Sequence, residues 1–536
     1  RIGDWSSDVC SSDLYKIANK LFRIVKKILK LLTSRMVIIG VALLLEFCWL
    51  AGIMMQLNEK SVYINYAVTI LSLIAVLSII NNPKMNPGYK LMWAVCILAL
   101  PVTGICLYGI LGHSSVARKF RTHYDTVLLS QGGVLGEEEE TRKKLEEENI
   151  LAAGQSSYLT NYAHYPVYEN TETEYYPLGD VWFEHFIEEL KKAEHYIFME
   201  YFIISEGYLW DTVLEILKEK AAAGVDVRVI YDDFGCVTTL PYQYYKSLQQ
   251  VGIKCAAFNQ FRPVLNVILN NRDHRKIAVI DGHTAFTGGI NLADEYINRK
   301  ERFGHWKDSG ICLHGEAVWS FTVMFLQMWS TITGMECNFE SYRPEIYHEE
   351  EFKKDGFVQP YGDSPLDGET VGEHVYLNII SQAKKYLYIF TPYLIPDNET
   401  LTALCMAAKR GVDVRIVTPG IPDKKIVYIL TQANYEILLE SGVQIYQYTP
   451  GFIHSKSFVC DDEVATVGTI NMDYRSMYLH FECGVWMYGS SAVAQVKEDA
   501  LTTFEQCEQI NMDYCRKKNF AVRALRGALK FLAPLL

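Results

Sequence analysis

Two stretches of this chain, residues 271–291 and 451–471, carry the same spaced pattern of polar residues. Each reads His, any residue, Lys, four residues, Asp, six residues, Gly, two residues and Asn. The matching positions are His274, Lys276, Asp281, Gly288 and Asn291, followed by His454, Lys456, Asp461, Gly468 and Asn471. One H-x-K-x4-D pattern arises by chance in roughly 3% of chains of this kind. Two copies that also agree at the later Gly and Asn therefore indicate a duplicated functional unit.

The residues around each motif predict a strand, a turn and a second strand. Apolar runs at 277–280 and 458–460 are followed by turn residues and then by another apolar run. Because side chains two apart on a strand point to the same face, His274 is expected beside Lys276, and the second motif repeats this arrangement. A neutral imidazole next to an ammonium suits attack on a phosphorus atom or proton transfer to a phosphate ester. Either histidine alone would more often be a buried structural residue, and the repeat favours the active-site interpretation.

These paired motifs resemble those of the phospholipase D superfamily, and the chain is most similar to the bacterial cardiolipin synthases within it. The resemblance implies one active site, with one covalent phosphohistidine and a second histidine that protonates the leaving alcohol, without a metal or other cofactor. His274 would attack and His454 would transfer the proton, although the near symmetry of the repeat allows the reverse order. Lys276 and Lys456 would offset charge on the phosphoryl oxygens.

Further residues are candidates for binding phosphate or orienting the histidines. Side chains able to hydrogen-bond a phosphate oxygen are Asn291, Thr469 and Asn471. Gly289 stands where many superfamily members carry Ser or Thr, so the two motifs are not expected to contribute equally. The resemblance places histidine-orienting acids at Asp308 and Glu482, with surface salt bridges as the alternative. Asp281 and Asp461 are catalytic candidates by motif, but their position in turns suits a structural role equally well.

The region after residue 155 repeats at the level of strands and helices. The run 195–204 is echoed by 385–395, the run 221–233 by 407–420, and the run 251–258 by 441–448. Strands that alternate with helical patterns predict an α/β fold. We expect two phospholipase D-like α/β sandwich domains, 156–350 and 351–536, and the resemblance implies that they pack about a pseudo-twofold axis. A charged linker over 116–155 precedes them, and a C-terminal amphipathic helix ends the chain.

The N-terminal part is predicted to be a membrane anchor over 15–115. Apolar segments at 36–55, 62–80 and 91–111 are each near the ~20 residues that cross a bilayer, giving an anchor of two or three transmembrane helices. This predicts a multi-pass protein of a bacterial cell membrane. The side that carries the catalytic part stays open, because three crossings place it outside whereas a hairpin or interfacial first segment places it inside. Residues 1–14 resemble translated sequencing-adapter read-through and are expected to be an artefact that does not belong to the fold.

Net charge and cysteine spacing limit the kinds of ligand and partner that the sequence predicts. A net charge of −12 argues against nucleic acid, which needs a basic footprint. The 13 cysteines show no zinc-ligand spacing. The expected substrate is phosphatidylglycerol in a membrane, two molecules giving cardiolipin and glycerol. The alternatives are a hydrolase of the same superfamily, another phosphatidyltransferase and a catalytically inactive lipid-binding scaffold. The oligomeric state is not predicted.

Overall fold

The computed structural model describes residues 59–83, 85–109, 115–130, 132–136, 139–260, 271–348, 351–516 and 520–535. These residues fall into two compact units. One contains helices α3 to α5, and the other contains the described residues from 117 onward. The expected segment 36–55 and residues 1–14 lie outside the described ranges.

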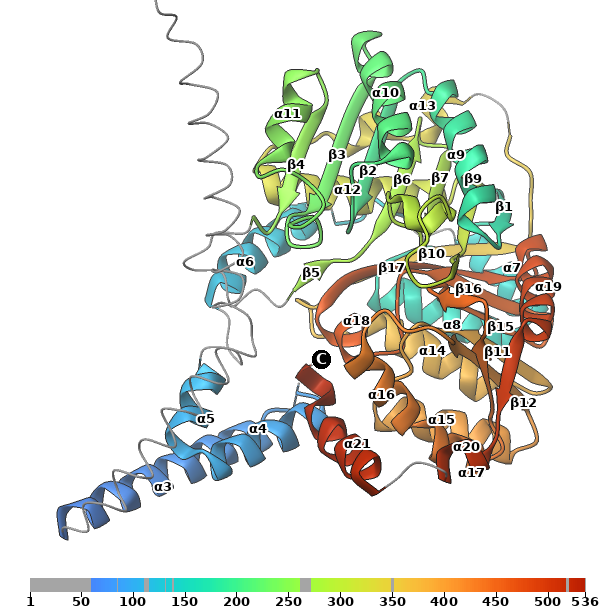
Figure 1. Ribbon diagram of the computed structural model, residues 1–536. Helices are drawn as coiled ribbons and strands as arrows, with labels where there is room; N and C mark the ends of the chain where they lie inside the picture. Colours follow the sequence, from blue (N-terminus) through green and yellow to red (C-terminus); the bar gives the residue numbers. More distant parts are fainter. Residues whose placement is uncertain are drawn as a thin grey trace, which may run out of the picture. The chain divides into compact units, whose positions relative to one another are not determined.

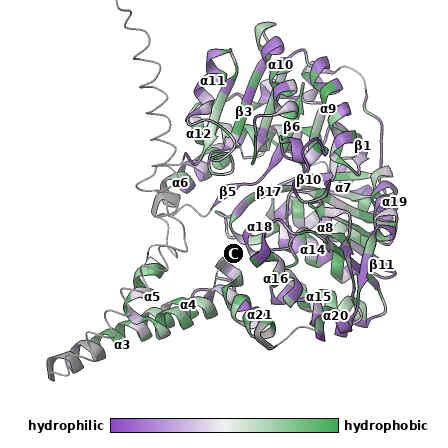
Figure 2. Cartoon of the chain, in the orientation of Figure 1, coloured by the Kyte–Doolittle hydropathy of each residue, from purple (hydrophilic) through white to green (hydrophobic). Residues whose placement is uncertain are grey.

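The first unit is a set of packed helices. Its elements are α3 (Glu59–Ile80), α4 (Pro87–Ala99) and α5 (Pro101–Leu107). All three contact one another and are rich in apolar residues (Figure 2). The backbone of α5 lies so close to α4 that a Cβ at Gly104 would come within 2.6 Å of the Cys96 carbonyl oxygen. Only glycine permits this approach.

Among the described residues, no helix has both the length and the apolar content needed to cross a membrane.

The expected apolar segments map unequally onto these helices. The segment 62–80 lies within α3, but the segment 91–111 is divided between α4 and α5. Pro101 occupies the first turn of α5. A proline has no N–H to donate to the preceding turn and so favours a new helix start over a continuous one. The described part of the segment 91–111 is therefore divided into two helices and is not one continuous helix.

The second unit contains two sheets of the same topology (Figure 1). In spatial order, the first sheet consists of β1 (Thr171–Tyr176), β9 (Gly310–Gly315), β7 (Thr284–Gly288), β6 (Lys276–Ile280), β2 (Tyr196–Tyr201), β3 (Asp226–Asp232) and β4 (Lys254–Phe258). In matching order, the second consists of β10 (Phe357–Asp363), β17 (His480–Tyr488), β16 (Val464–Gly468), β15 (Ser457–Cys460), β11 (Tyr386–Phe390), β12 (Asp413–Pro419) and β13 (Gln444–Tyr448), with β18 (Cys507–Ile510) at the edge. Three neighbouring strands run parallel in each sheet: β2, β3 and β4 in the first, and β11, β12 and β13 in the second. The other strands given above pair antiparallel with their neighbours.

Helices cover both faces of each sheet. The helices of the first half are α9 (Gly179–Lys192), α10 (Tyr208–Ala222), α11 (Tyr244–Gln250), α12 (Val318–Thr333) and α13 (Pro344–Tyr347). Those of the second half are α14 (Val371–Gln382), α15 (Asn398–Lys409), α16 (Lys425–Ala433), α17 (Tyr435–Glu440), α18 (Tyr474–Tyr478), α19 (Ser491–Glu505), α20 (Met512–Arg516) and α21 (Phe520–Leu532). The expected repeat of α/β domains thus appears as two matched sheets with matched helices.

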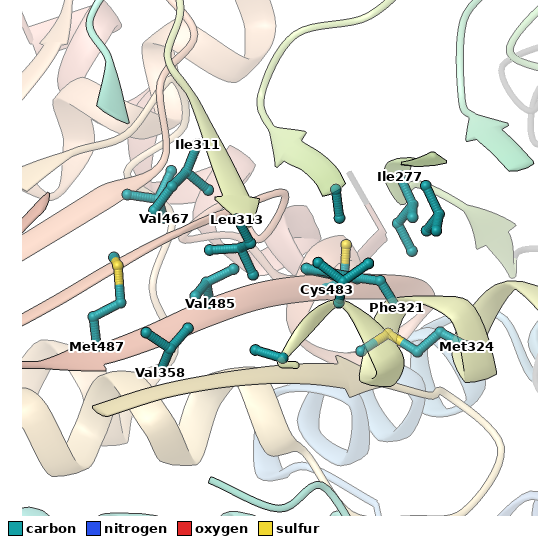
Figure 3. Packing of buried hydrophobic residues seen from close by; sticks show 14 of the residues in the cluster. Ile277, Ile311, Leu313, Phe321, Met324, Val358, Val467, Cys483, Val485 and Met487 are labelled. Carbon is teal, nitrogen blue, oxygen red and sulfur yellow. The ribbon is translucent and has the colours of Figure 1, made fainter. Parts of the chain in front are cut away.

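The inner faces of the two sheets share one apolar core with α12 and α19. Ile277 and Leu313 of the first half pack in it with Val467 and Val485 of the second, beside Phe321 of α12 (Figure 3). The outer faces have separate cores. Burial at roughly 25 cal/mol per Å² of apolar surface makes such a shared core a strong link between the halves.

The expected linker is largely helical and partly packed. It contains α6 (Ser115–Ser130), α7 (Glu139–Glu148) and the start of α8 (Ile150–Tyr162). Leu145 and Ala152 are buried in the outer core of the second half, although the neighbouring glutamates stay exposed. Helices α7 and α8 therefore pack against the second domain and do more than connect two parts of the chain.

Candidate active site

Each motif histidine lies in a short gap between two strands. His274 stands between β5 (Arg272–Asp273) and β6, and His454 stands between β14 (Gly451–Ile453) and β15. The residues that follow each histidine form a strand in the middle of a sheet, because their side chains are apolar and buried on both faces. The histidines are thus fixed at the ends of central strands.

The short strand before each histidine pairs with the opposite half of the chain. β5 pairs in parallel with β17, and β14 pairs in parallel with β8 (His305–Lys307). The backbone N–H of His274 donates to the Phe481 carbonyl at 2.9 Å, and that of His454 donates to the Lys307 carbonyl at 2.7 Å. Each half therefore holds the motif histidine of the other.

The carboxylate that contacts each histidine also comes from the opposite half of the chain. His274 Nδ1 lies 2.9 Å from Glu482 Oε2, and His454 Nδ1 lies 2.6 Å from Asp308 Oδ2. Both carboxylates are fully buried. A carboxylate on Nδ1 fixes the imidazole so that Nε2 is presented to a substrate, and it stabilises a positive imidazolium. The structure therefore places all four residues in two reciprocal pairs.

The two motif lysines lie buried beside their histidines. Lys276 Nζ donates to the His274 carbonyl at 2.6 Å, and Lys456 Nζ donates to the His454 carbonyl. Burial lowers the pKa of Lys276 to about 8 and the pKa of Lys456 to about 7, against the opposing effect of the two carboxylates. An ammonium has three donors, so each lysine retains N–H groups for a phosphate oxygen.

Both histidines are held in the neutral form. Burial, followed by the charge of Lys456, lowers the pKa of His454 to about 4, and Asp308 opposes this shift. Burial lowers the pKa of His274 well below its usual range, and both Lys276 and Lys456 add to the effect. Because lysines from both motifs act on His274, the two motifs share one site. A neutral imidazole is the nucleophilic form.

The two half-sites differ at the position after the motif glycine. The Thr469 hydroxyl donates to Glu482 Oε2 at 2.5 Å and accepts from the Cys483 N–H at 3.0 Å, so it supports the acid and not a phosphate directly. At the equivalent Gly289, a Cβ would lie 2.0 Å from Asp308 Oδ1. The shorter Asp308 therefore needs glycine there, which explains the missing hydroxyl.

The motif asparagines brace the loops around the site. Asn291 accepts from the Ile203 N–H at 3.0 Å and donates to the Tyr296 hydroxyl at 2.7 Å. Asn471 donates to the Ser476 hydroxyl at 3.0 Å, and its buried Oδ1 has no hydrogen-bond partner among the described residues. The Asn291 amide is thus used by the protein itself, whereas Asn471 keeps an acceptor atom for another group.

Asp281 and Asp461 lie at the far ends of their strands from the histidines. Asp281 accepts three backbone N–H groups, from residues 194 to 196, at 2.7–2.8 Å. Asp461 accepts the equivalent three from residues 384 to 386 at 2.6–2.8 Å. The strand between the histidine and the aspartate has five residues in β6 and four in β15, which span about 14–17 Å. The catalytic assignment of these two residues does not fit their placement, and the turn interpretation does.

A buried ionic cluster next to His274 escaped the sequence analysis. Arg275 Nη2 lies 2.6 Å from Glu200 Oε1, and Arg275 Nε lies 3.3 Å from Asp273 Oδ1. All three residues are nearly fully buried. Glu200 stands in an otherwise apolar strand, which is the signal that could have revealed it. The cluster fixes the corner between β5 and β6, and with it the position of His274.

Aromatic rings and one further histidine line the site. Phe202 lies edge-on to His274 with ring centroids 4.9 Å apart, and the His480 ring lies 5.5 Å from it. The rings within 6 Å of His454 are Tyr296, Trp306 and Phe452. Ligand atoms of His274, His480 and Glu482 lie within 4.8 Å of one another, a spacing that a metal ion could bridge. His480 was not expected, although it stands two residues before Glu482 and so on the same strand face.

Comparisons with known proteins agree with this arrangement. The family model described as "Cardiolipin synthase, PLD-like domain" matches residues 186–329 and 376–503, one match for each half. The model "Phospholipase_D-nuclease N-terminal" matches residues 70–113. Among solved structures, the phosphatidylserine synthase of Haemophilus influenzae aligns with a TM-score of 0.54 at 16% identity, covering 72% of this chain and all of that one. That similarity shows a shared fold.

Curated relatives align over most of the chain. An uncharacterized protein of Streptococcus mutans is 43% identical over 475 residues, which cover 86% of this chain and 99% of that protein. Cardiolipin synthases of Halalkalibacterium halodurans and Alkalihalophilus pseudofirmus are each 34% identical, covering 84% and 87% of this chain and 90% and 92% of theirs. Two matched half-domains and relatives that align over most of both chains lead to one conclusion: the chain belongs to the phospholipase D-like cardiolipin synthase family.

Proposed function

We propose that the chain is a cardiolipin synthase, a phosphatidyltransferase that joins two phosphatidylglycerol molecules and releases glycerol. One observation carries the mechanistic part of this proposal: two neutral histidines, each held by a carboxylate of the opposite half, share a site with two buried lysines. Such a site has a nucleophile, an acid and a positively charged cradle for a phosphodiester. The curated relatives named cardiolipin synthase support the choice of substrate.

In the first step, His274 Nε2 attacks the phosphorus atom of one phosphatidylglycerol and the bond to the glycerol oxygen breaks. His454, protonated in the substrate complex, gives its Nε2 proton to that oxygen, and free glycerol leaves. The negative phosphate raises the proton affinity of a neighbouring imidazole, and Asp308 stabilises the imidazolium that results. Lys276 and Lys456 offset charge on the phosphoryl oxygens.

In the second step, neutral His454 takes the proton from a primary hydroxyl of the second phosphatidylglycerol. The alkoxide oxygen attacks the phosphorus, and the bond to His274 breaks to regenerate the free enzyme. The phosphohistidine retains the energy of the diester, so no nucleotide is consumed. The same two steps run backwards when glycerol is abundant.

We place this reaction at a bacterial cell membrane, with attachment through residues 15–115. Both substrates are lipids, and the N-terminal family match lies within that range. Helix α3 also exposes large apolar side chains such as Leu71, Ile74 and Leu77. The multi-pass arrangement rests on the apolar segments of the sequence alone. Retention of the protein in membranes washed with alkaline carbonate is the expected result, and its release would point to peripheral attachment.

Hydrolysis is the second candidate function, because water can replace the second lipid with the same residues. Product analysis by mass spectrometry separates the two. Purified protein in vesicles receives labelled phosphatidylglycerol, in parallel with His274→Ala and His454→Ala. Cardiolipin and glycerol from the parent, and neither from the variants, is the expected result. Phosphatidic acid as the main product would make the chain a hydrolase, and no turnover would favour an inactive lipid-binding scaffold.

The roles of the two histidines can be separated with a phosphatidyl ester of p-nitrophenol. This leaving group departs without a proton, so loss of the general acid should matter little in the first step. His454→Ala should therefore release one equivalent of p-nitrophenol and retain a labelled phosphatidyl group after denaturation. His274→Ala should do neither. The opposite pattern would assign attack to His454.

A further inference from the structure

The two half-sites differ in the residues that flank their histidines, although the backbone is nearly the same. Two residues before His454, Phe452 faces Trp306 across the strand pair. Two residues before His274, Arg272 faces His480 in the same register. The surroundings of His454 are thus aromatic, while those of His274 carry a guanidinium and an imidazole. Two half-sites with the same backbone but different flanking side chains are suited to bind two different parts of a substrate.

His480 is a buried side chain without a hydrogen bond. It is 9% exposed, and neither of its ring nitrogens has a hydrogen-bond partner among the described residues. Its Nδ1 lies 3.5 Å from Glu482 Oε1, which is also buried and also lacks one. An unsatisfied buried polar atom typically costs about 1–3 kcal/mol. Glu482 Oε1 can pair weakly with His480 Nδ1, but His480 Nε2 has no partner among the described residues, and this buried atom beside His274 marks a place for a polar ligand group.

Arg272 adds a positive charge at the same place. Its guanidinium stacks on the Phe234 ring at 4.1 Å, and it forms no ion pair within the described ranges. Burial lowers the pKa of Arg272; Asp232 opposes this shift, and the charge of Arg475 adds to it. Arg475, at the start of α18, also lowers the pKa of His480, after the larger effect of burial. Helix α18, which carries Arg475, contacts strand β17, which carries His480, and β17 in turn pairs with the strand of Arg272.

Like charges held together in a partly buried place favour an anion. A metal ion bridging His274, His480 and Glu482 would meet repulsion from both arginines, so the cluster suits a phosphate better than a cation. The phosphate that reacts already has Lys276 and Lys456. The substrate pair of the proposed reaction brings a second phosphate, separated from the reacting one by a single three-carbon bridge. That phosphate must lie beside the catalytic centre.

We propose that Arg272, Arg475 and His480 form a subsite for the headgroup of the acceptor lipid. The two arginines bind its phosphate, and His480 binds the free hydroxyl of its glycerol. This inference rests on the proposed function and names what distinguishes a lipid acceptor from water or glycerol. It predicts that the subsite governs the choice of acceptor and leaves the first chemical step unchanged.

The test compares acceptors with and without a phosphate in one protein. Vesicles containing phosphatidylglycerol are supplied with labelled free glycerol, and two products are followed. Headgroup exchange, which gives labelled phosphatidylglycerol, uses an acceptor without phosphate. Cardiolipin formation uses an acceptor with one. In Arg272→Gln, cardiolipin formation should fall about 10- to 100-fold relative to exchange, as expected for loss of a buried charge contact. Exchange itself should stay within about threefold of the parent.

Three further variants keep the test decisive. Arg475→Gln should shift the same ratio, and His480→Asn, which retains a donor, should shift it less than His480→Phe. The matched control is Arg299→Gln, because Arg299 also stacks on an aromatic ring, that of Tyr208 at 3.6 Å, outside the cluster. Its ratio should equal that of the parent.

The outcomes separate this inference from the proposed function. Absence of cardiolipin from the parent protein would contradict the function. Equal loss of exchange and cardiolipin in Arg272→Gln and Arg475→Gln would mean that the arginines position His274, and the subsite would be rejected. An unchanged ratio in all the cluster variants would reject it as well. Addition of inorganic phosphate should inhibit cardiolipin formation more than exchange; if it inhibits both equally, the anion binds at the catalytic lysines instead.

Discussion

At the scale of single residues, the proposed chemistry depends on the carboxylates that contact histidines and not on those that accept backbone N–H groups in turns. Glu482 contacts Nδ1 of His274 and Asp308 contacts Nδ1 of His454, while Asp281 and Asp461 each accept three backbone N–H groups. All four are buried acids. What separates their roles is the group they bind, because only an acid on the imidazole can influence its tautomer and charge.

This distinction predicts opposite effects of isosteric amide substitutions. Glu482→Gln should lower kcat by about 10³- to 10⁴-fold with little change in Tm, because an amide no longer fixes the imidazole of His274. Asp281→Asn should instead lower the free energy of unfolding by about 1–3 kcal/mol, since it weakens three backbone hydrogen bonds, and leave kcat of the folded protein unchanged. The rate of cardiolipin formation measures kcat of each variant, and thermal melting measures its stability. A large loss of kcat in Asp281→Asn without unfolding would restore the catalytic assignment.

The buried lysines predict the alkaline side of the pH profile. The pKa of Lys456 is about 7 and that of Lys276 about 8, both lowered by burial, so their positive charge is lost as pH rises through this window. In the free enzyme kcat/KM should therefore fall above about pH 7. Lys456→Arg keeps its charge across the range.

The arginine variant should move the alkaline limb of kcat/KM upward by about one pH unit, to the value set by Lys276, even if its maximum rate is lower. Initial rates in vesicles between pH 5 and pH 10 provide the measurement. A limb that does not move would assign the titration to another group.

At the scale of elements, the crossing strands β5 and β14 make one site out of two domains. They bring the backbone of each histidine against the opposite half and carry its side chain to the opposite carboxylate. The backbones approach so closely that a Cβ at Gly451 would lie 2.2 Å from the His305 carbonyl oxygen. Glycine is required there by contact and not by an unusual backbone angle.

Gly451→Val should push β14 away from β8 and separate His454 from Asp308. A displacement of about 1 Å at a catalytic group can cost about 100-fold in rate, so kcat should fall by at least that factor. The matched control is Gly154→Ala in α8, where no atom lies near the new methyl group. That variant should keep full activity and gain a little stability, by about 0.5–1 kcal/mol. Comparable activity of Gly451→Val and the parent would show that the crossing strand does not set the geometry.

The sequence predicted these elements to different degrees. Strands β6 and β15 were expected, with the histidine and lysine of each motif side by side, because short apolar runs and two-residue spacing are local signals. Asp308 and Glu482 were expected to orient histidines, but which acid serves which histidine was not. β5 has only two residues, and Arg272 pairs with His480 more than two hundred residues later. No periodicity marks such a pairing, since its stability comes from the packed halves around it.

The sequence likewise did not predict why residue 289 is glycine. In the structure, the Asp308 carboxylate occupies the space that a side chain at residue 289 would need. Nor did the sequence predict the buried charge of Glu200, whose partner Arg275 is distant in the sequence. Contacts of this kind depend on which faces meet, and a single sequence specifies faces only through local patterns.

At the scale of the whole molecule, the two halves are one cooperative body because they share a core. Helix α12 belongs to the first half by sequence, yet it contacts β10 of the second half as well as β2 and β6 of the first. Phe321 of this helix is fully buried between the two sheets (Figure 3). The fused arrangement also serves the site, since neither half contains a complete histidine and carboxylate pair.

Phe321→Ala should therefore destabilise both halves together. Removing a buried phenyl group typically costs about 3–5 kcal/mol, and the loss should appear as equally faster hydrogen exchange at the amides of β2 and β11, which lie in different sheets. Leu501→Ala, at a residue 42% exposed on α19, is the control and should leave exchange in both strands unchanged. If β2 alone lost protection, the halves would unfold separately, and the shared core would be a contact between independent domains. Equal loss would mean that an intact active site and an intact fold are lost in the same event.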